Sequence, residues 1–267
     1  MNLYFSTEII TYLNFILFSL LCFTRIENKT DINKIIYLFN LFLMVSISFF
    51  HYIIFLNLTS NKLGLVLSLL TLIIFFTFFS FSIISYQFIR LRILFIPFFL
   101  IILIFRSVIS MSSLDGQSST NLFNNQYLVI HIITSLLSYS LITISLVTSF
   151  CIYIQDLFIK KMRYNKIVNE FLPSMYESEL LAIRFLYFTI FFLIISLISG
   201  LNYFVETGDN LIYFFNEKVI LSLLTLFLTL FIIIVRIKKG LSGQMIFKMI
   251  FLSYLLISFS YFGIKLL

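Results

Sequence analysis

The stretch LVIHIITSLLSYSLITISLVTSFCIYIQDL, residues 128–157, decides the fold class of this chain. Its one charged residue is Asp156, and the apolar run before it exceeds the roughly 20 residues that an α-helix needs to cross a bilayer. The whole chain of 267 residues has this character, since 61% of its residues are hydrophobic and 11% are charged. A soluble domain carries roughly 25% charged residues. The sequence therefore predicts an all-α, polytopic integral membrane protein.

Eight apolar runs of this kind divide the chain, and we expect each of them to form a transmembrane helix. They are Ile9–Phe23, Ile35–Leu58, Leu63–Tyr86, Ile93–Ile109, Leu128–Leu157, Leu180–Phe204, Val219–Val235 and Met245–Leu266. Because these runs leave no room for a separate soluble domain, residues 1–267 are predicted to form a single membrane domain.

The basic residues predict the orientation of the chain in the membrane. Lysine and arginine gather in alternate loops, for example at Arg90, at Lys160–Lys166 and at Arg236, whereas the intervening loops are poor in basic residues. Basic loops mark the cytoplasmic side. Both termini are therefore expected to face outward. Because the basic residues lie in loops that set this orientation, the formal charge of +7 does not indicate nucleic-acid binding.

The chain has only two histidines, His51 and His131, and each lies inside an apolar run. With this threading their helices run in opposite directions, and the two depths differ by only about 6 Å at about 1.5 Å per residue. Imidazole is an axial ligand of haem iron. Two imidazoles at a shared depth predict one haem held between the second and fifth helices. The alternative is that each histidine makes an interhelical hydrogen bond.

Other polar residues are weaker candidates for the same site. Ser135 and Tyr139 follow His131 at i+4 and i+8, so they share its helix face and are candidates to orient the imidazole or line a pocket. Arg106 and Lys218 lie on the outer side, where they are candidates to bind haem propionates. The alternatives are a stripe of small packing residues and ordinary interfacial cations.

The acidic residues argue against an ion-coupled permease. None of the eleven is expected in the middle of a helix, and Glu8 is expected at or beyond the outer end of the first one. A proton- or sodium-coupled transporter normally buries a carboxylate near the midplane. No pairing of nucleophile and base, metal triad or phosphate loop is visible, so no enzyme activity is expected.

The second half of the chain resembles the cytochrome c assembly family of haem-handling membrane proteins, which includes CcsA and CcmC. The resemblance rests on residues 128–161, LVIHIITSLLSYSLITISLVTSFCIYIQDLFIKK, on NEKVILSLLTLF at 216–227 and on RIKKGLSGQ at 236–244. It covers about residues 128–267 and is greatest for the eight-helix YpjD-type bacterial inner-membrane proteins. In the first half, the histidine of SFFHYII falls where such proteins have one. The chain has no tryptophan, unlike the tryptophan-rich external segment of CcsA and CcmC.

The resemblance implies a haem-handling scaffold in a bacterial inner membrane, where the charge rule would place both termini in the periplasm. Together with the two histidines it predicts bis-histidine haem b near the periplasmic side and a role in cytochrome c assembly or maturation, with other maturation or membrane proteins as partners. The alternatives are a non-haem accessory subunit of another membrane protein or transporter and, less favoured, a small-molecule permease.

Overall fold

The computed structural model describes residues 2–24, 26, 32–58, 62–112, 125–160, 172–206, 216–240 and 242–260. Every element in these ranges is helical, because apolar runs in a bilayer satisfy their backbone hydrogen bonds within the helix. The chain divides into two compact units, Met1–Thr120 and Asn121–Leu267. Each unit is described by itself.

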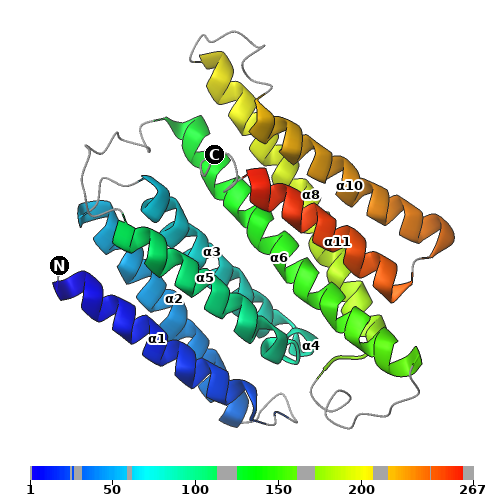
Figure 1. The fold of residues 1–267 in the computed structure, drawn as a ribbon, viewed down its shortest axis with the longest axis horizontal. Helices are drawn as coiled ribbons and strands as arrows, with labels where there is room; N and C mark the ends of the chain where they lie inside the picture. Colours follow the sequence, from blue (N-terminus) through cyan, green and yellow to red (C-terminus); the bar gives the residue numbers. More distant parts are fainter. Residues whose placement is uncertain are drawn as a thin grey trace. The chain divides into compact units, whose positions relative to one another are not determined.

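The first unit contains four long helices and one short one. They are α1 (Asn2–Cys22), α2 (Ile32–Leu58), α3 (Lys62–Ile84), α4 (Tyr86–Ile89) and α5 (Arg92–Ser112). Helix α1 packs on α2 and on α5, and α3 packs on α2, α4 and α5 (Figure 1). A cluster of phenylalanine rings fills the centre, in which Phe78 lies 4.4 Å from Phe95 and 5.1 Å from Phe99 between ring centroids.

The second unit is built around one long helix. It contains α6 (Gln126–Lys160), α8 (Met175–Glu206), α10 (Glu217–Lys239) and α11 (Gly243–Ser258). Helix α6 packs along α8 and α11, and α10 packs on α8 and α11. Helix α8 begins with a capping box, in which the Ser174 N–H donates to Glu177 Oε2 at 2.9 Å and the Glu177 N–H donates to Ser174 Oγ at 3.3 Å.

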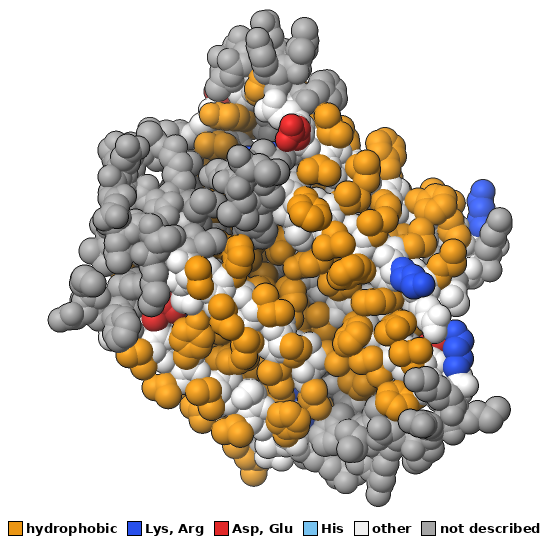
Figure 2. All heavy atoms as spheres, viewed as in Figure 1, with side chains coloured by type: hydrophobic (Ala, Val, Ile, Leu, Met, Phe, Trp, Pro, Cys, Tyr) orange, Lys and Arg blue, Asp and Glu red, His pale blue; other side chains and the backbone are white. Residues whose placement is uncertain are grey.

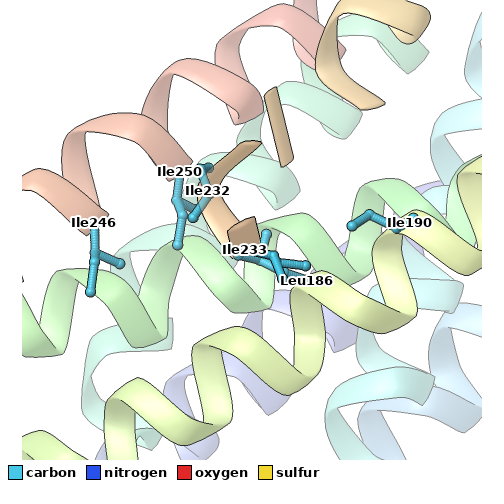
Figure 3. Packing of buried hydrophobic residues seen from close by; sticks show 6 residues of the cluster. All are labelled: Leu186, Ile190, Ile232, Ile233, Ile246 and Ile250. Carbon is cyan, nitrogen blue, oxygen red and sulfur yellow. The ribbon is translucent and has the colours of Figure 1, made fainter. Parts of the chain in front are cut away.

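A cluster of aliphatic side chains joins α8, α10 and α11 in the second unit (Figure 3). Its members are Leu186, Ile190, Ile232, Ile233, Ile246 and Ile250. Helix α11 also lies very close to α6, because a Cβ added at Gly243 would meet Ile152 Cγ2 at 2.8 Å. Glycine therefore permits this close approach of two helices.

The eight predicted runs correspond to the eight long helices among the described residues, which confirms the all-α architecture. Five of these helices are long and apolar enough to cross a membrane. In α1 and α11 the apolar helices, Ser6–Cys22 and Gly243–Ser258, are shorter. At the N-terminus α1 begins at Asn2 rather than at Ile9, and the predicted end of the last run, Leu266, lies outside the described residues. Several basic residues of the predicted cytoplasmic loops lie outside the described residues: Arg25, Lys29, Lys161, Arg163 and Lys166.

The surface of the described residues is largely apolar, as expected of a chain in lipid (Figure 2). On α10, for example, Phe227 is 67% exposed and Phe231 is 54% exposed. Many serines and threonines of the described helices are buried instead, and their hydroxyls donate to backbone carbonyls one turn earlier, as Thr143 does to Ser140. Among the described residues, many polar side chains thus lie inside and many large apolar side chains lie on the surface, as in a multi-pass membrane protein.

Candidate functional site

A buried cluster of charged and polar side chains joins α1, α2 and α5 in the first unit. Glu8 Oε1 lies 3.0 Å from His51 Nε2, and Glu8 Oε2 accepts a hydrogen bond from Arg106 Nη2 at 3.3 Å. All three are buried: His51 is 0% exposed, Arg106 1% and Glu8 7%. The Glu8 carboxylate therefore contacts both candidates for haem binding in this unit, the predicted ligand His51 and the predicted propionate partner Arg106.

Thr11 completes the cluster from the next turn of α1. Its hydroxyl accepts a hydrogen bond from Arg106 Nη2 at 3.1 Å and donates to the Glu8 carbonyl at 2.7 Å. The other two nitrogens of Arg106, Nε and Nη1, are buried and have no hydrogen-bond partner among the described residues. The guanidinium therefore has unused hydrogen-bond donors, although its positive charge is balanced by the Glu8 carboxylate.

The polar face of α1 explains how Glu8 comes to be buried. Thr7, Glu8, Thr11 and Asn14 are buried on one side of the helix, and the opposite side exposes apolar residues such as Leu13. Residues spaced by three or four share a helix face, so this face is polar and turned inward. The expectation that Glu8 lies at or beyond the outer end of the first helix is wrong. Its carboxylate is inside because Arg106 and His51 compensate it there, which apolar periodicity could not reveal.

This polar face continues one turn further along α1. Asn40 Nδ2 donates to Asn14 Oδ1 at 2.7 Å and so ties α2 to α1. A cavity of about 10 Å³ borders the same residues and is lined by Thr11, Asn14 and Ser48 together with apolar side chains. That volume holds about one water molecule.

His131 in the second unit has a different, uncharged environment. Its Nδ1 lies 2.7 Å from the backbone oxygen of Ser196 and 3.2 Å from Ser196 Oγ, both on α8. A carbonyl oxygen only accepts hydrogen bonds, so Nδ1 must carry the proton of this contact. In a neutral imidazole with Nδ1 protonated, Nε2 holds the lone pair. This tautomer is the one that a histidine uses when it ligates a metal through Nε2.

Gly200 provides the space in which the His131 ring lies. A Cβ added at Gly200 would meet His131 Nδ1 at 3.0 Å and Cε1 at 3.1 Å. Glycine one turn after Ser196 therefore lets the imidazole lie directly against α8. The ring is half-buried, whereas His51 is enclosed completely. Sequence reasoning missed both Ser196 and Gly200.

The remaining candidates make contacts of their own. Ser135 donates to the Ile132 carbonyl at 2.9 Å, and Tyr139 pairs through its hydroxyl with Tyr254 of α11 at 3.1 Å. Lys218 is exposed at the start of α10, where its backbone oxygen accepts a hydrogen bond from Ser260 at 3.0 Å. The polar group that the structure brings to His131 is thus Ser196, which comes from a different helix.

The chain belongs to the cytochrome c assembly protein family, whose model matches residues 34–267. The match includes His51, Arg106 and His131, and it begins after Glu8. The chain is also 27% identical over 137 residues to a protein of Azospirillum brasilense described as an uncharacterized 28.8 kDa protein in the nifR3-like 5′ region. That alignment covers 51% of this chain and 49% of the other, so the chain spans about half the length of the curated relative it matches. No solved structure matches the chain.

The two histidines fit a haem group to different degrees. His131 fits an axial ligand, since its Nδ1–H is held by a carbonyl and its Nε2 keeps a lone pair. His51 fits less well, because the Nε2 atom is engaged by Glu8 and the ring is fully buried. Within the described ranges no group of three or more His, Cys, Asp or Glu is arranged to hold a metal ion.

Proposed function

We propose that this protein binds haem b in a bacterial inner membrane and assists cytochrome c maturation, with His131 as an axial ligand of the iron. The family to which the chain belongs is associated with cytochrome c assembly, and this association supports the general role. The single observation that supports the ligand is the hydrogen bond from His131 Nδ1 to the Ser196 carbonyl. It fixes the tautomer whose Nε2 can bind iron.

His51 is the candidate for the second axial ligand. To bind iron through Nε2 it must first break its contact with Glu8 Oε1, which is 3.0 Å long. We therefore expect His51 to contribute less than His131 to haem binding. The orientation proposed with this function places both termini in the periplasm, because the basic residues concentrate in alternate loops.

The bound haem would supply redox-active iron, and the residues of this chain would hold and orient it. Ser196 and Gly200 position the His131 ring, and Arg106 and Lys218 are the cations proposed for the propionates. No covalent chemistry is assigned to the chain itself. We propose that it acts as a haem-binding accessory of maturation rather than as an enzyme.

The test is the absorption spectrum of the protein purified from haem-replete cells. A Soret band with sharp α and β bands on reduction is expected for the natural chain. His131→Ala should remove most of the bound haem, and His51→Ala should remove less, because the two imidazoles differ in availability. Ile133→Ala and Phe50→Ala are matched controls at exposed apolar positions beside each histidine and should keep the spectrum.

The opposite outcomes are equally clear. A colourless natural protein would contradict haem binding and favour the role of a non-haem accessory subunit. A spectrum unchanged by both histidine substitutions would show that the imidazoles serve only as interhelical hydrogen-bonding groups. Loss of haem only in His51→Ala would reverse the order of importance proposed here.

A further inference from the structure

One backbone carbonyl of the second unit, that of Ser196 on α8, receives several hydrogen-bond donors at once. The His131 Nδ1–H donates to it at 2.7 Å, and the Ser199 hydroxyl donates to it at 3.0 Å. In an α-helix the N–H of each residue also donates to the carbonyl four residues earlier, which for Ser196 is the N–H of Gly200. Three donors therefore converge on one oxygen atom.

These donors must share the Ser196 oxygen, because a carbonyl oxygen has only two lone pairs. The helix itself holds the Gly200 N–H in place, so the imidazole and the Ser199 hydroxyl are the two donors that compete. The competition takes place in an interior with little access for water, since Ser196 is 5% exposed and Ser199 is 6% exposed. The imidazole N–H has a second, longer contact with Ser196 Oγ at 3.2 Å, which is consistent with an incompletely available carbonyl.

We propose that Ser199 limits the electron donation of His131, because its hydroxyl competes with the imidazole Nδ1–H for the Ser196 carbonyl. A stronger hydrogen bond from Nδ1–H makes an imidazole more electron-rich at Nε2 and a more basic metal ligand. The Ser199 hydroxyl weakens that hydrogen bond and keeps Nε2 a weaker donor. Ser199 is thus a positioning residue, which acts on Nε2 only through the Ser196 carbonyl and the His131 ring.

The consequence for iron rests on the proposed function, in which His131 is an axial ligand. Hydrogen bonds to an axial ligand are one of the means by which a protein sets the reduction potential of haem. A more electron-rich imidazole stabilises ferric iron relative to ferrous iron. Loss of the Ser199 hydroxyl should therefore move the reduction potential to more negative values. The shared carbonyl itself depends only on contacts within the second unit.

The first measurement is nuclear magnetic resonance of the haem-free protein in detergent, with histidine labelled at its ring nitrogens. The chain has only two histidines, and His131→Ala identifies the signals of His131 by their loss. Ser199→Ala should shift the His131 Nδ1–H resonance downfield, because the Ser196 carbonyl then accepts more strongly from the imidazole. Ser140→Ala is the matched control, since its hydroxyl makes the same kind of bond, 2.8 Å to the Leu137 carbonyl, which His131 does not use.

Ser199→Cys keeps the test decisive if Ser199→Ala folds poorly. A thiol is a weaker hydrogen-bond donor than a hydroxyl, so this variant should shift the resonance in the same direction by a smaller amount. An unchanged resonance in both variants, an upfield shift, or an equal shift in Ser140→Ala would overturn the competition. If neither Ser199 variant folds, the hydroxyl is required for packing rather than for tuning, and the proposal is wrong.

The second measurement is the reduction potential of the haem-bound protein, which separates this proposal from the proposed function. Ser199→Ala should have a more negative potential than both the natural chain and Ser140→Ala. A shifted resonance with an unchanged potential would overturn the effect on iron. A colourless natural protein whose Ser199→Ala variant still shows the downfield shift would overturn the proposed function and leave the shared carbonyl intact. A haem-binding protein in which Ser199→Ala changes neither the resonance nor the potential would overturn this proposal and leave the proposed function standing.

Discussion

The two histidines of this chain lie in environments that differ in charge and in enclosure. His51 is completely buried and bound to the carboxylate of an ion pair, whereas His131 is half-buried and bound to a backbone carbonyl. In each, a ring nitrogen lies 3.0 Å or less from an oxygen atom of a neighbouring helix. The difference shows that the hydrogen-bond partner determines what a membrane histidine can do. The carboxylate of Glu8 includes His51 in a charged network, whereas the carbonyl of Ser196 fixes the tautomer of His131.

The largest expected effect tests the charged side of this comparison. Arg106→Gln should destabilise the protein by about 3 kcal/mol, because it leaves the Glu8 carboxylate buried without its counter-ion. The measurement is the free energy of unfolding of the haem-free protein in detergent. Arg184→Gln is the control, since this arginine of α8 is exposed and its loss should change stability little.

The double substitution sharpens the same test. Glu8→Gln combined with Arg106→Gln removes both charges, so it should cost less than Arg106→Gln alone. A single Arg106→Gln variant as stable as Arg184→Gln would show that the ion pair contributes nothing. The two histidines would then differ in solvent exposure but not in the energetic importance of a neighbouring charge.

A smaller effect tests the uncharged side. Gly200→Ala should destabilise the second unit by about 1–2 kcal/mol, because the new methyl group would lie 3.0 Å from His131 Nδ1 and force the ring to move. The sign is informative, since alanine within a helix otherwise stabilises by roughly 0.5–1 kcal/mol relative to glycine. Leu201→Ala, an exposed neighbour on α8, controls for a general loss of apolar surface. Stabilisation by Gly200→Ala would show that the ring does not lie against α8.

The smallest expected effect concerns the neutral tyrosine pair of the second unit. Tyr139→Phe should cost about 1 kcal/mol, because it removes the 3.1 Å contact with the Tyr254 hydroxyl. Tyr254→Phe should cost about the same, and the double variant should cost less than the sum of the two singles. Tyr187→Phe, at an exposed position, is the control. Additive losses would mean that the two hydroxyls do not interact.

The sequence by itself determined the helical architecture. Long runs of Leu, Ile and Phe have one stable form in a bilayer, in which each helix satisfies its own backbone, so the eight predicted runs appear as eight long helices in the described chain. The residue types also selected His51, His131 and Arg106 as the notable polar groups inside these runs, because a charged or ionisable side chain in a membrane is costly without a partner.

Only the tertiary structure decided which partner each polar group has. Glu8 joins His51 over 43 positions of sequence and Arg106 over 98, and Ser196 joins His131 over 65. Apolar periodicity gives helix positions and faces, but it carries no information on which helices pack together. For this reason the predicted first run began at Ile9, whereas α1 begins at Asn2 and includes Glu8. The buried carboxylate of Glu8 is compensated there by Arg106 from α5 and His51 from α2.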